Sequence, residues 1–211
     1  MKDRVGLAAI LAGGRARRMG ADKAGLPLAG VPLIEHVWAR LVPVAERVIT
    51  VGGRPWLAAR GVEAVADRYP EANSMGGIAT ALAYAARGGA GEEAWVLAVA
   101  CDMPFLEPAL LHGLWGVREG WDAVVPRVQK GYEPLCALYR SGCLPVFERE
   151  IARGNLRVLD IFRAVRTREV PEAELRRWDP ELRSFWNINR PEDLERAVRE
   201  LSAPLKRPAA G

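Results

Sequence analysis

Short apolar runs alternate with amphipathic stretches along the first 130 residues of the chain. Strand-length apolar runs occupy residues 5–12, 47–51, 63–65, 94–100 and 123–126. Apolar residues at helical spacing occupy residues 33–41, 77–86 and 108–117. This alternation of strand and helix predicts a parallel sheet covered by helices on both faces. Such crossovers are right-handed, and ligands are expected at the carboxyl ends of the strands.

Shorter elements are expected after residue 130, where strands and helices alternate less regularly. They are a strand at 135–139, helices at 144–152 and 158–162, an edge strand at 166–170, and a helix from residue 191 to about residue 201. We therefore expect an α/β protein with a single Rossmann-like three-layer α/β/α domain over residues 1–201 and a mostly parallel twisted sheet. The Pro/Ala-rich residues 202–211 are expected to form a flexible tail.

The composition is that of an ordinary globular chain. Half of the 211 residues are hydrophobic and 27% are charged. No apolar run approaches the roughly 18 residues of a membrane-spanning helix, so no membrane is expected as a partner. The formal charge is only +4 and no basic stripe is interleaved with aromatic residues, so nucleic acid is not expected either.

The cysteines bear on location and on metal chemistry. Cys101, Cys136 and Cys143 form no CxxC pair, and their odd number argues against a disulfide framework. A cytoplasmic location is therefore expected. With only two histidines beside them, a zinc site is not expected, and a metal should be a hard ion held by carboxylates.

A glycine-rich, arginine-rich turn follows the first strand. Residues 13–20 read GGRARRMG, and Lys23 comes three positions later. Glycine lets backbone N–H groups approach anionic oxygens, and the cations neutralise the charge that gathers there. The turn matches neither GxGxxG nor GxxxxGK[ST]. A surface turn with incidental arginines is the alternative, but the adjacent Gly13 and Gly14 at a strand end favour close approach of a polyphosphate.

Two aspartates follow other predicted strands. Asp102 comes directly after the most apolar run, where it could coordinate Mg²⁺ or merely begin a turn ahead of Pro104. Asp67 ends a short strand and precedes the segment 73–77 (NSMGG), whose glycines are expected to start a helix close to a ligand. Aspartate and glycine are common in loops, so the Asp67 segment indicates a ligand site only in combination with the glycine-rich turn and Asp102.

Two asparagines close the set of candidate residues. Asn187 and Asn189 point to the same side of an extended segment, and their amides can ligate a metal or bind a phosphate. Capping of the following helix is the alternative for Asn189. His36 and His112 have no partner pattern, and packing is the expected role for both.

With these elements in this order, the chain resembles the molybdenum cofactor guanylyltransferases, also called molybdopterin-guanine dinucleotide biosynthesis protein A. The matching stretches run from residue 7 to about residue 195, and they are LAGGRARRMGADKAGLPLAGVPLIEHV, the segments at Asp67 and Asp102, EPLCALYR, and FWNINRPEDL. The Asp22-Lys23 pair after RMG distinguishes this group from related nucleotidylyltransferases. The resemblance implies a fold like that of the nucleotide-diphospho-sugar transferases.

The resemblance also implies an activity. The family joins GMP from GTP to the terminal phosphate of molybdenum-bound molybdopterin and releases pyrophosphate, with Mg²⁺ as cofactor. We expect the phosphate to attack the α-phosphorus of GTP in line, without a general base. Transient contacts with other cofactor-biosynthesis proteins and with acceptor molybdoenzymes are also implied.

Roles for individual residues follow by position in the family's motifs. The expected nucleotide pocket consists of Leu11, Ala12, Gly13 and Gly14. The other expected roles are phosphate contacts by Arg18 and Lys23, nucleoside binding by Asp67, Mg²⁺ binding by Asp102, and a position facing the metal or the pterin for Asn187 and Asn189.

The chain departs from the family pattern at two places. Relatives often carry Asn before Arg-Pro where this chain reads VGGRP at 51–55, and Gly-Pro-Leu where it reads NSM at 73–75. Two alternatives therefore remain. One is a nucleotidyltransferase of other specificity, acting as a molybdopterin cytidylyltransferase or on a sugar phosphate, and the other is a non-catalytic nucleotide-binding protein of cofactor assembly.

Overall fold

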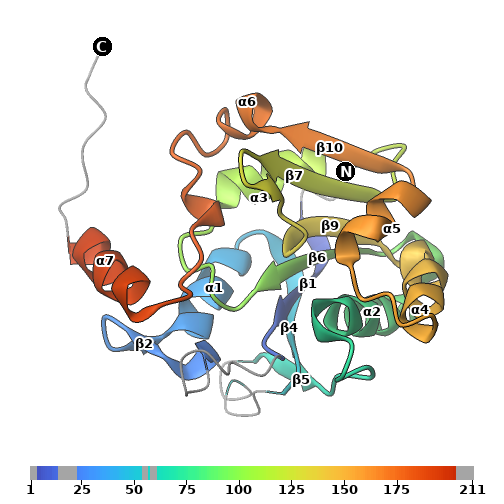
Figure 1. Cartoon of the computed structure of the whole chain (residues 1–211), viewed down its shortest axis with the longest axis horizontal. Coiled ribbons are helices and arrows are strands. Elements are labelled where there is room, and N and C mark those ends of the chain that lie inside the picture. Colours follow the sequence, from blue (N-terminus) through green and yellow to red (C-terminus); the bar gives the residue numbers. More distant parts are fainter. Residues whose placement is uncertain (1–3, 14–22, 54–56, 58–60, 203–211) are drawn as a thin grey trace.

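A mixed sheet flanked by helices forms the core of the computed structural model, which describes residues 4–13, 23–53, 57 and 61–202 (Figure 1). Its strands are β1 (Val5–Leu11), β4 (Ala45–Val51), β5 (Glu63–Val65), β6 (Trp95–Ala100), β7 (Ala123–Val128), β8 (Gly131–Tyr132), β9 (Cys136–Arg140) and β10 (Thr167–Pro171). The strand order is β10-β7-β9-β6-β1-β4-β5, with β8 paired to β7. Of the strands in this sheet, β8 and β9 run in the direction opposite to the other six. The predicted mostly parallel sheet is confirmed.

The chain changes direction across the sheet between β1 and β6. β1 pairs with β4 on one side and with β6 on the other, both in parallel. β4 and β5, which follow β1 in this sheet, lie on one side of β1, and β6 and the later strands lie on the other side. In open α/β sheets the crevice at this switch point is where ligands bind.

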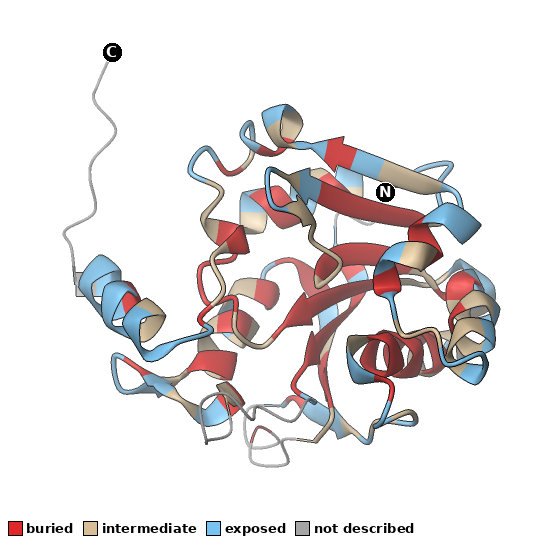
Figure 2. Ribbon diagram, in the orientation of Figure 1, coloured by how far each residue is buried: buried red, intermediate tan, exposed pale blue. Residues whose placement is uncertain are grey.

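Helices cover both faces of the sheet. They are α1 (Leu33–Leu41), α2 (Asn73–Ala86), α3 (Pro108–Gly116), α4 (Leu144–Ala152), α5 (Val158–Ala164), α6 (Glu172–Leu175) and α7 (Pro191–Ser202). Ala8 and Ile10 of β1 face a core shared with α1 and α3, whereas Leu7 and Ala9 face a core shared with α2, α4 and α5. This period of two divides the buried residues between two cores, and the central strands and α2 are accordingly red in Figure 2.

The first turn of α2 differs from the prediction. The helix begins at Asn73, which has a φ of 51°, and not at the glycines. Gly76 and Gly77 lie inside the helix. Position 76 requires glycine because the Tyr69 backbone leaves no room for a side chain, and Gly77 packs tightly against the Leu11 side chain. A Cβ on Gly76 would lie 2.2 Å from the Tyr69 carbonyl oxygen, and one on Gly77 would lie 3.3 Å from Leu11 Cδ2.

A small third apolar cluster joins α7 to β2 and to the start of α1. It contains Leu28 of β2 (Pro27–Leu28), Phe105, Ile188 and Ala197 of α7. β2 pairs with β3 (Val31–Pro32) in a hairpin that the sequence pattern did not predict, because two-residue strands carry no periodic signal. The predicted final helix is confirmed as α7. Ser202, the first residue of the predicted tail 202–211, belongs to α7, and residues 203–211 lie outside the described part of the chain.

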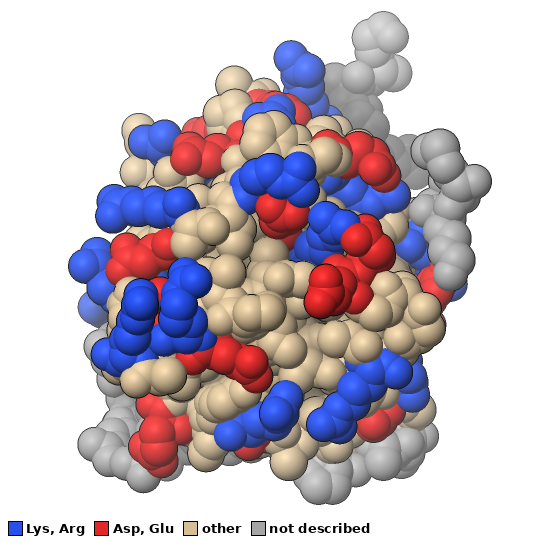
Figure 3. Space-filling view, turned by 90° about the vertical axis from the view of Figure 1, so that its right-hand side faces the viewer, with Lys and Arg blue, Asp and Glu red and all other residues tan. Residues whose placement is uncertain are grey.

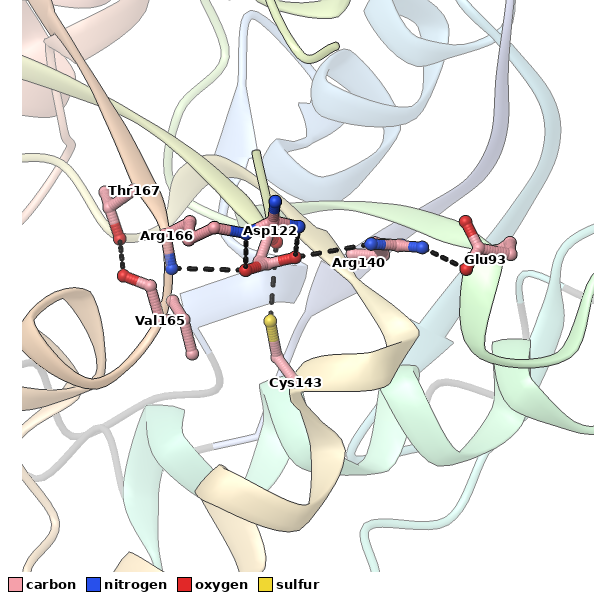
Figure 4. Close-up of polar contacts among 7 residues, drawn as sticks. All are labelled: Glu93, Asp122, Arg140, Cys143, Val165, Arg166 and Thr167. Carbon is pink, nitrogen blue, oxygen red and sulfur yellow. Dashed lines mark hydrogen bonds and ion pairs between the residues drawn. The ribbon is translucent and has the colours of Figure 1, made fainter. Parts of the chain in front are cut away.

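A half-buried carboxylate joins strands at the opposite end of the sheet (Figure 4). Asp122, directly before β7, accepts hydrogen bonds from Arg166 Nε and Nη2, both over 2.9 Å, and from the backbone N–H of Arg166 over 3.2 Å. Arg140 bonds the same carboxylate over 3.3 Å and also pairs with Glu93. The hydrogen bonds from Arg166 lower the pKa of Asp122 to about 2.

The surface beyond this network carries mixed charge. On the face seen in Figure 3, Lys and Arg side chains are interspersed with Asp and Glu. Among the described residues, no helix is both long enough and apolar enough to cross a bilayer.

Candidate functional site

Lys23, Asp102 and Asn189 meet at the carboxyl ends of the two central strands. Lys23 begins the 3₁₀ helix η1 (Lys23–Gly25), and Asp102 lies two residues beyond β6. The Lys23 ammonium forms an ion pair with Asp102 Oδ2 and donates a hydrogen bond to Asn189 Oδ1 over 2.7 Å. These partners lie 79 and 166 positions from Lys23 in the sequence. The Lys23 and Asp102 side chains are 19% and 13% exposed, so solvent screens the contact only in part.

Backbone contacts fix the two oxygen-bearing residues. The Ile188 N–H donates to the Asp102 carbonyl over 2.9 Å, and Ile188 itself is fully buried in the third cluster. In an extended segment this places Asn187 and Asn189 on the side opposite Ile188. Asp193 Oδ2 accepts from the N–H groups of Asn189 and Arg190, both over 2.9 Å. Asp193 therefore caps α7, and the Asn189 amide oxygen bonds Lys23.

Two buried oxygens at this edge accept no hydrogen bond from a described residue. They are Asp102 Oδ1 and Asn187 Oδ1. Burial of an acceptor without a partner is costly, so each such atom calls for a ligand or an ordered water. Mg²⁺ prefers carboxylate and amide oxygens and often uses one or two protein carboxylates beside substrate phosphates. No three His, Cys, Asp or Glu side chains of the described part cluster as metal ligands. A donor set of one carboxylate and the amide oxygens fits Mg²⁺.

Gly13 and Gly52 form a second part of the site, where β1 and β4 end. A Cβ on Gly52 would lie 2.5 Å from both the N and the Cα of Gly13, and Gly52 has a φ of 94°. No side chain fits there, so the two chain segments touch backbone to backbone. The neighbouring Gly53 has a φ of 75°, but no described residue lies within 4 Å of such a Cβ.

Asp67 is held next to this backbone contact. Its Oδ1 accepts from the Tyr69 N–H and from Thr80 Oγ1, both over 2.9 Å. Its Oδ2 faces Gly13, since a Cβ on Gly13 would lie 3.7 Å from that oxygen. One carboxylate oxygen is thus fixed by the protein, and the other is directed at the end of β1.

The remaining predicted nucleotide-pocket residues divide into two groups. Leu11 and Ala12 are buried at the end of β1, where Leu11 lies against Gly77 and the Ala12 N–H donates to the Val51 carbonyl over 2.9 Å. They support the strand end below the site. Gly14 and Arg18 lie outside the described residues.

Sequence reasoning did not single out Thr80, which hydrogen-bonds Asp67, or Glu133, which lies near Asp102. Thr80 is the one polar residue among the buried residues of α2, a signal that it has a specific partner. Glu133 lies near Asp102 in the stretch EPLCALYR. Burial raises the pKa of Glu133, the Asp102 charge acts in the same direction, and Lys130 opposes both.

The histidines and two of the cysteines have packing contacts. His36 Nε2 lies 2.9 Å from the Leu28 carbonyl oxygen, and His112 Nδ1 lies 2.8 Å from that of Pro108. Burial raises the pKa of Cys136, and it raises that of Cys143 to about 12. These thiols are not activated nucleophiles.

A cavity of about 440 Å³ begins at the residues that precede Asn187. Phe185 and Trp186 line it together with Lys130 and Arg196. The Trp186 ring stacks on Phe105 with centroids 4.9 Å apart, and the Arg196 guanidinium lies 4.4 Å from the Trp186 centroid. The lining thus combines two aromatic rings with four cationic side chains and three glutamates.

Known proteins share this architecture and much of this sequence. The profile of the MobA-like NTP transferase domain matches residues 8–169. The molybdenum cofactor guanylyltransferase of Desulfosudis oleivorans is 37% identical, over 92% of this chain and 95% of that protein. A probable molybdenum cofactor guanylyltransferase of Pelotomaculum thermopropionicum is also 37% identical, over 89% of each chain. The crystal structure of molybdopterin-guanine dinucleotide biosynthesis protein A from Archaeoglobus fulgidus superposes with a TM-score of 0.78 at 32% identity, covering 93% of this chain and 98% of that one.

Proposed function

Because the chain belongs to the MobA-like NTP transferase family, we propose that it transfers GMP from GTP to the terminal phosphate of molybdenum-bound molybdopterin, forming the guanine dinucleotide. The observation that carries the proposal is the convergence of Lys23, Asp102 and Asn189 at the switch point of the sheet. The names of the relatives that cover most of the chain support the substrates.

The chemistry asks for positioning and charge neutralisation. An oxygen of the acceptor phosphate forms a bond to the α-phosphorus of GTP, and the bond from that phosphorus to the β-bridging oxygen breaks. The leaving pyrophosphate takes the electron pair. A phosphate monoester has a second pKa of about 6, so it is already largely ionised and needs no general base. Lys23 is placed to neutralise charge on the phosphates.

Asp102, with the amide oxygens of Asn187 and Asn189, is the group that would hold Mg²⁺. The ion would supply positive charge that offsets the negative charge of the phosphates. The buried, unpartnered Oδ1 atoms of Asp102 and Asn187 support this assignment.

The nucleoside belongs on the other side of β1. Asp67 Oδ2 faces the end of that strand and can accept hydrogen bonds from ribose hydroxyls or from base N–H groups. The asparagine that relatives often carry before Arg-Pro corresponds to Gly53 in this chain, so at that position the loop offers no side-chain amide to the base.

The acceptor belongs on the side of Asn187. The cavity that begins at Trp186 is lined by four cationic side chains beside three glutamates, and Arg196 over the Trp186 ring is one cation that could bind a negatively charged acceptor. A molybdopterin whose phosphate lies at Lys23 would extend toward this cavity.

A nucleotide panel tests the proposal. Calorimetry with Mg²⁺ should show tighter binding of GTP than of CTP, UTP or ATP, and pyrophosphate should be released only when molybdenum-loaded molybdopterin is present. Preference for CTP would instead identify a cytidylyltransferase. Binding of GTP without pyrophosphate release would identify a non-catalytic assembly protein.

Two variants test the residue roles. Lys23→Ala should reduce turnover by about two orders of magnitude or more with the fold intact. Asp102→Ala should lose activity or its dependence on Mg²⁺. Normal Mg²⁺ stimulation of the Asp102 variant, or near-normal turnover of the Lys23 variant, would contradict the assigned role.

A further inference from the structure

The Lys23 ammonium bonds the same residues that would hold the divalent cation. It contacts Asp102 Oδ2 and lies 2.7 Å from Asn189 Oδ1. The charge of Asp102 is therefore offset by Lys23, and the Asn189 amide oxygen is hydrogen-bonded by the same ammonium.

A lysine ammonium and a divalent ion would repel each other across one carboxylate, even with the ammonium on Asp102 Oδ2 and the ion on the unpartnered Oδ1. Mg²⁺ binds oxygen at about 2.0–2.1 Å, so an ammonium on the same carboxylate would lie within a few ångströms of a double positive charge. The Lys23 and Asp102 side chains are 19% and 13% exposed, which limits screening of that repulsion.

Of the three groups, Lys23 is the one free to move. Asp102 is held by the Ile188 N–H, and Asn189 by the Asp193 carboxylate. The buried Ile188 ties both to the third apolar cluster. Lys23 instead carries its charge on a flexible four-carbon stem at the start of a three-residue helix.

We propose that the Lys23 ammonium and the divalent cation occupy Asp102 in turn. This inference rests on the proposed function, because the triphosphate is what draws Lys23 away. Without nucleotide, Lys23 bonds Asp102 and Asn189 and opposes metal binding. With nucleotide, Lys23 bonds the phosphates, and the oxygens of Asp102 and Asn189 become available. Binding of metal and of nucleotide is then coupled, and by linkage each strengthens the other.

Manganese binding in the absence of nucleotide tests the exchange. Free Mn²⁺ is measured by electron paramagnetic resonance for the full chain, for Lys23→Met and for Lys23→Arg. The Lys23→Met variant should bind Mn²⁺ about tenfold or more tightly than the wild type, a change of about 1.4 kcal/mol. Lys23→Arg keeps the charge and should stay within about threefold of the wild type.

Lys130→Met is the matched control for long-range charge. Lys130 is exposed and lies near enough to Glu133 to affect its pKa, so its removal deletes one positive charge in the same region of the protein. This variant should bind Mn²⁺ as the wild type does. Equal tightening in Lys130→Met and Lys23→Met, or no tightening in Lys23→Met, would overturn the exchange.

A direct readout of Lys23 is also accessible. The chain has four lysines, at positions 2, 23, 130 and 206, so Lys23→Met assigns the Lys23 Nζ signal in an NMR spectrum. Adding a non-hydrolysable GTP analogue without metal should shift this signal, and an unshifted signal at saturation would overturn the exchange. Neither measurement uses the acceptor or turnover. If the transferase assay fails, the manganese and NMR results can still be interpreted. If the manganese or NMR result contradicts the exchange, the transferase assay still tests the proposed function.

Discussion

Gly52 shows how a single atom decides what a position tolerates. Its missing Cβ leaves room for the backbone of Gly13, and this contact sets the spacing of β1 and β4 at the site. Gly53 also has a positive φ, but no described residue would contact a Cβ at that position. The two neighbouring glycines are therefore matched in conformation and differ in packing.

The substitution Gly52→Ala should be far more damaging than Gly53→Ala. Gly53→Ala pays only for a positive φ, about 1 kcal/mol of unfolding free energy. Gly52→Ala adds a clash with fixed backbone atoms and should lose about 2–4 kcal/mol, together with nucleotide affinity. Urea denaturation of both variants measures the difference, and equal losses would show that the contact at Gly13 is unimportant.

Thr80 and Thr50 make a second matched pair. Both are buried, but Thr80 Oγ1 bonds the Asp67 carboxylate over 2.9 Å, whereas Thr50 Oγ1 has no hydrogen-bond partner in the described chain. Thr80→Val should weaken GTP binding about fivefold or more because Asp67 loses its orientation. Thr50→Val removes an unsatisfied hydroxyl and should leave GTP binding unchanged, with equal or slightly higher stability. Calorimetry and thermal melting check both, and equal GTP affinities would exclude the positioning role of Thr80.

At the scale of elements, the segment from η5 (Arg183–Phe185) to α7 carries one wall of the site. Trp186, Asn187 and Asn189 lie on it in succession, and Ile188 anchors it. The position of this short segment therefore sets both the amide oxygens beside Lys23 and the aromatic wall of the cavity.

Arg196→Ala should raise the KM for molybdopterin about fivefold or more and leave kcat and the KM for GTP unchanged, because only the proposed acceptor cavity loses a cation. Arg118→Ala is the control, since Arg118 lies 3.6 Å from the Trp115 ring centroid in a similar contact outside the lining of that cavity. Steady-state kinetics distinguish them. A raised KM in both variants, or in neither, would argue against acceptor binding in this cavity.

Sequence patterns predicted the elements whose signal is local. The apolar run of β6 and the helical spacing of α1 were sufficient, because burial on both faces of a sheet and amphipathic covering leave period and length in the chain. The β2–β3 hairpin and the four-residue α6 were missed because they are too short to show a period. The start of α2 was misplaced because the contact of Gly76 with Tyr69 is tertiary.

At the scale of the whole molecule, the two ends of the sheet have different tasks. The carboxyl ends carry the candidate site, and the amino ends of β7 and β10 are joined by the Asp122 carboxylate (Figure 4). The resemblance to molybdenum cofactor guanylyltransferases and the expectation of a nucleotidyltransferase are confirmed by the family and by the relatives. The topology explains why Lys23, Asp102 and Asn189 could be expected at one edge, but their mutual contact depends on geometry that no spacing in the sequence encodes.

The Asp122 network should make stability depend on acid pH. The pKa of Asp122 falls from 3.8 to about 2 on folding, so the unfolded chain binds the proton first as the pH falls. The contribution of Asp122 to the free energy of unfolding is complete above about pH 5 and is lost as the pH falls from about 4 to about 2. At about pH 6, Asp122→Asn should cost about 1–2 kcal/mol, because the 63%-exposed Arg166 is partly screened.

Urea denaturation at about pH 6 and about pH 2.5 checks this window. The difference between wild type and Asp122→Asn should shrink at the lower pH. Glu119→Gln, which breaks an ion pair whose carboxylate is 82% exposed, should cost less than about 0.5 kcal/mol at both. A difference for Asp122→Asn that stays constant with pH would contradict the assigned shift.

The contacts of Lys23 also bear on the timing of synthesis. Its two partners emerge from the ribosome 79 and 166 residues after it, and the segment that carries the second is anchored by the last helix. A nascent chain can form most of its sheet before translation reaches that helix, yet its lysine still lacks one of the two oxygens. The proposed site for a triphosphate is therefore incomplete until residue 189 has been made and the helix that follows it can fold.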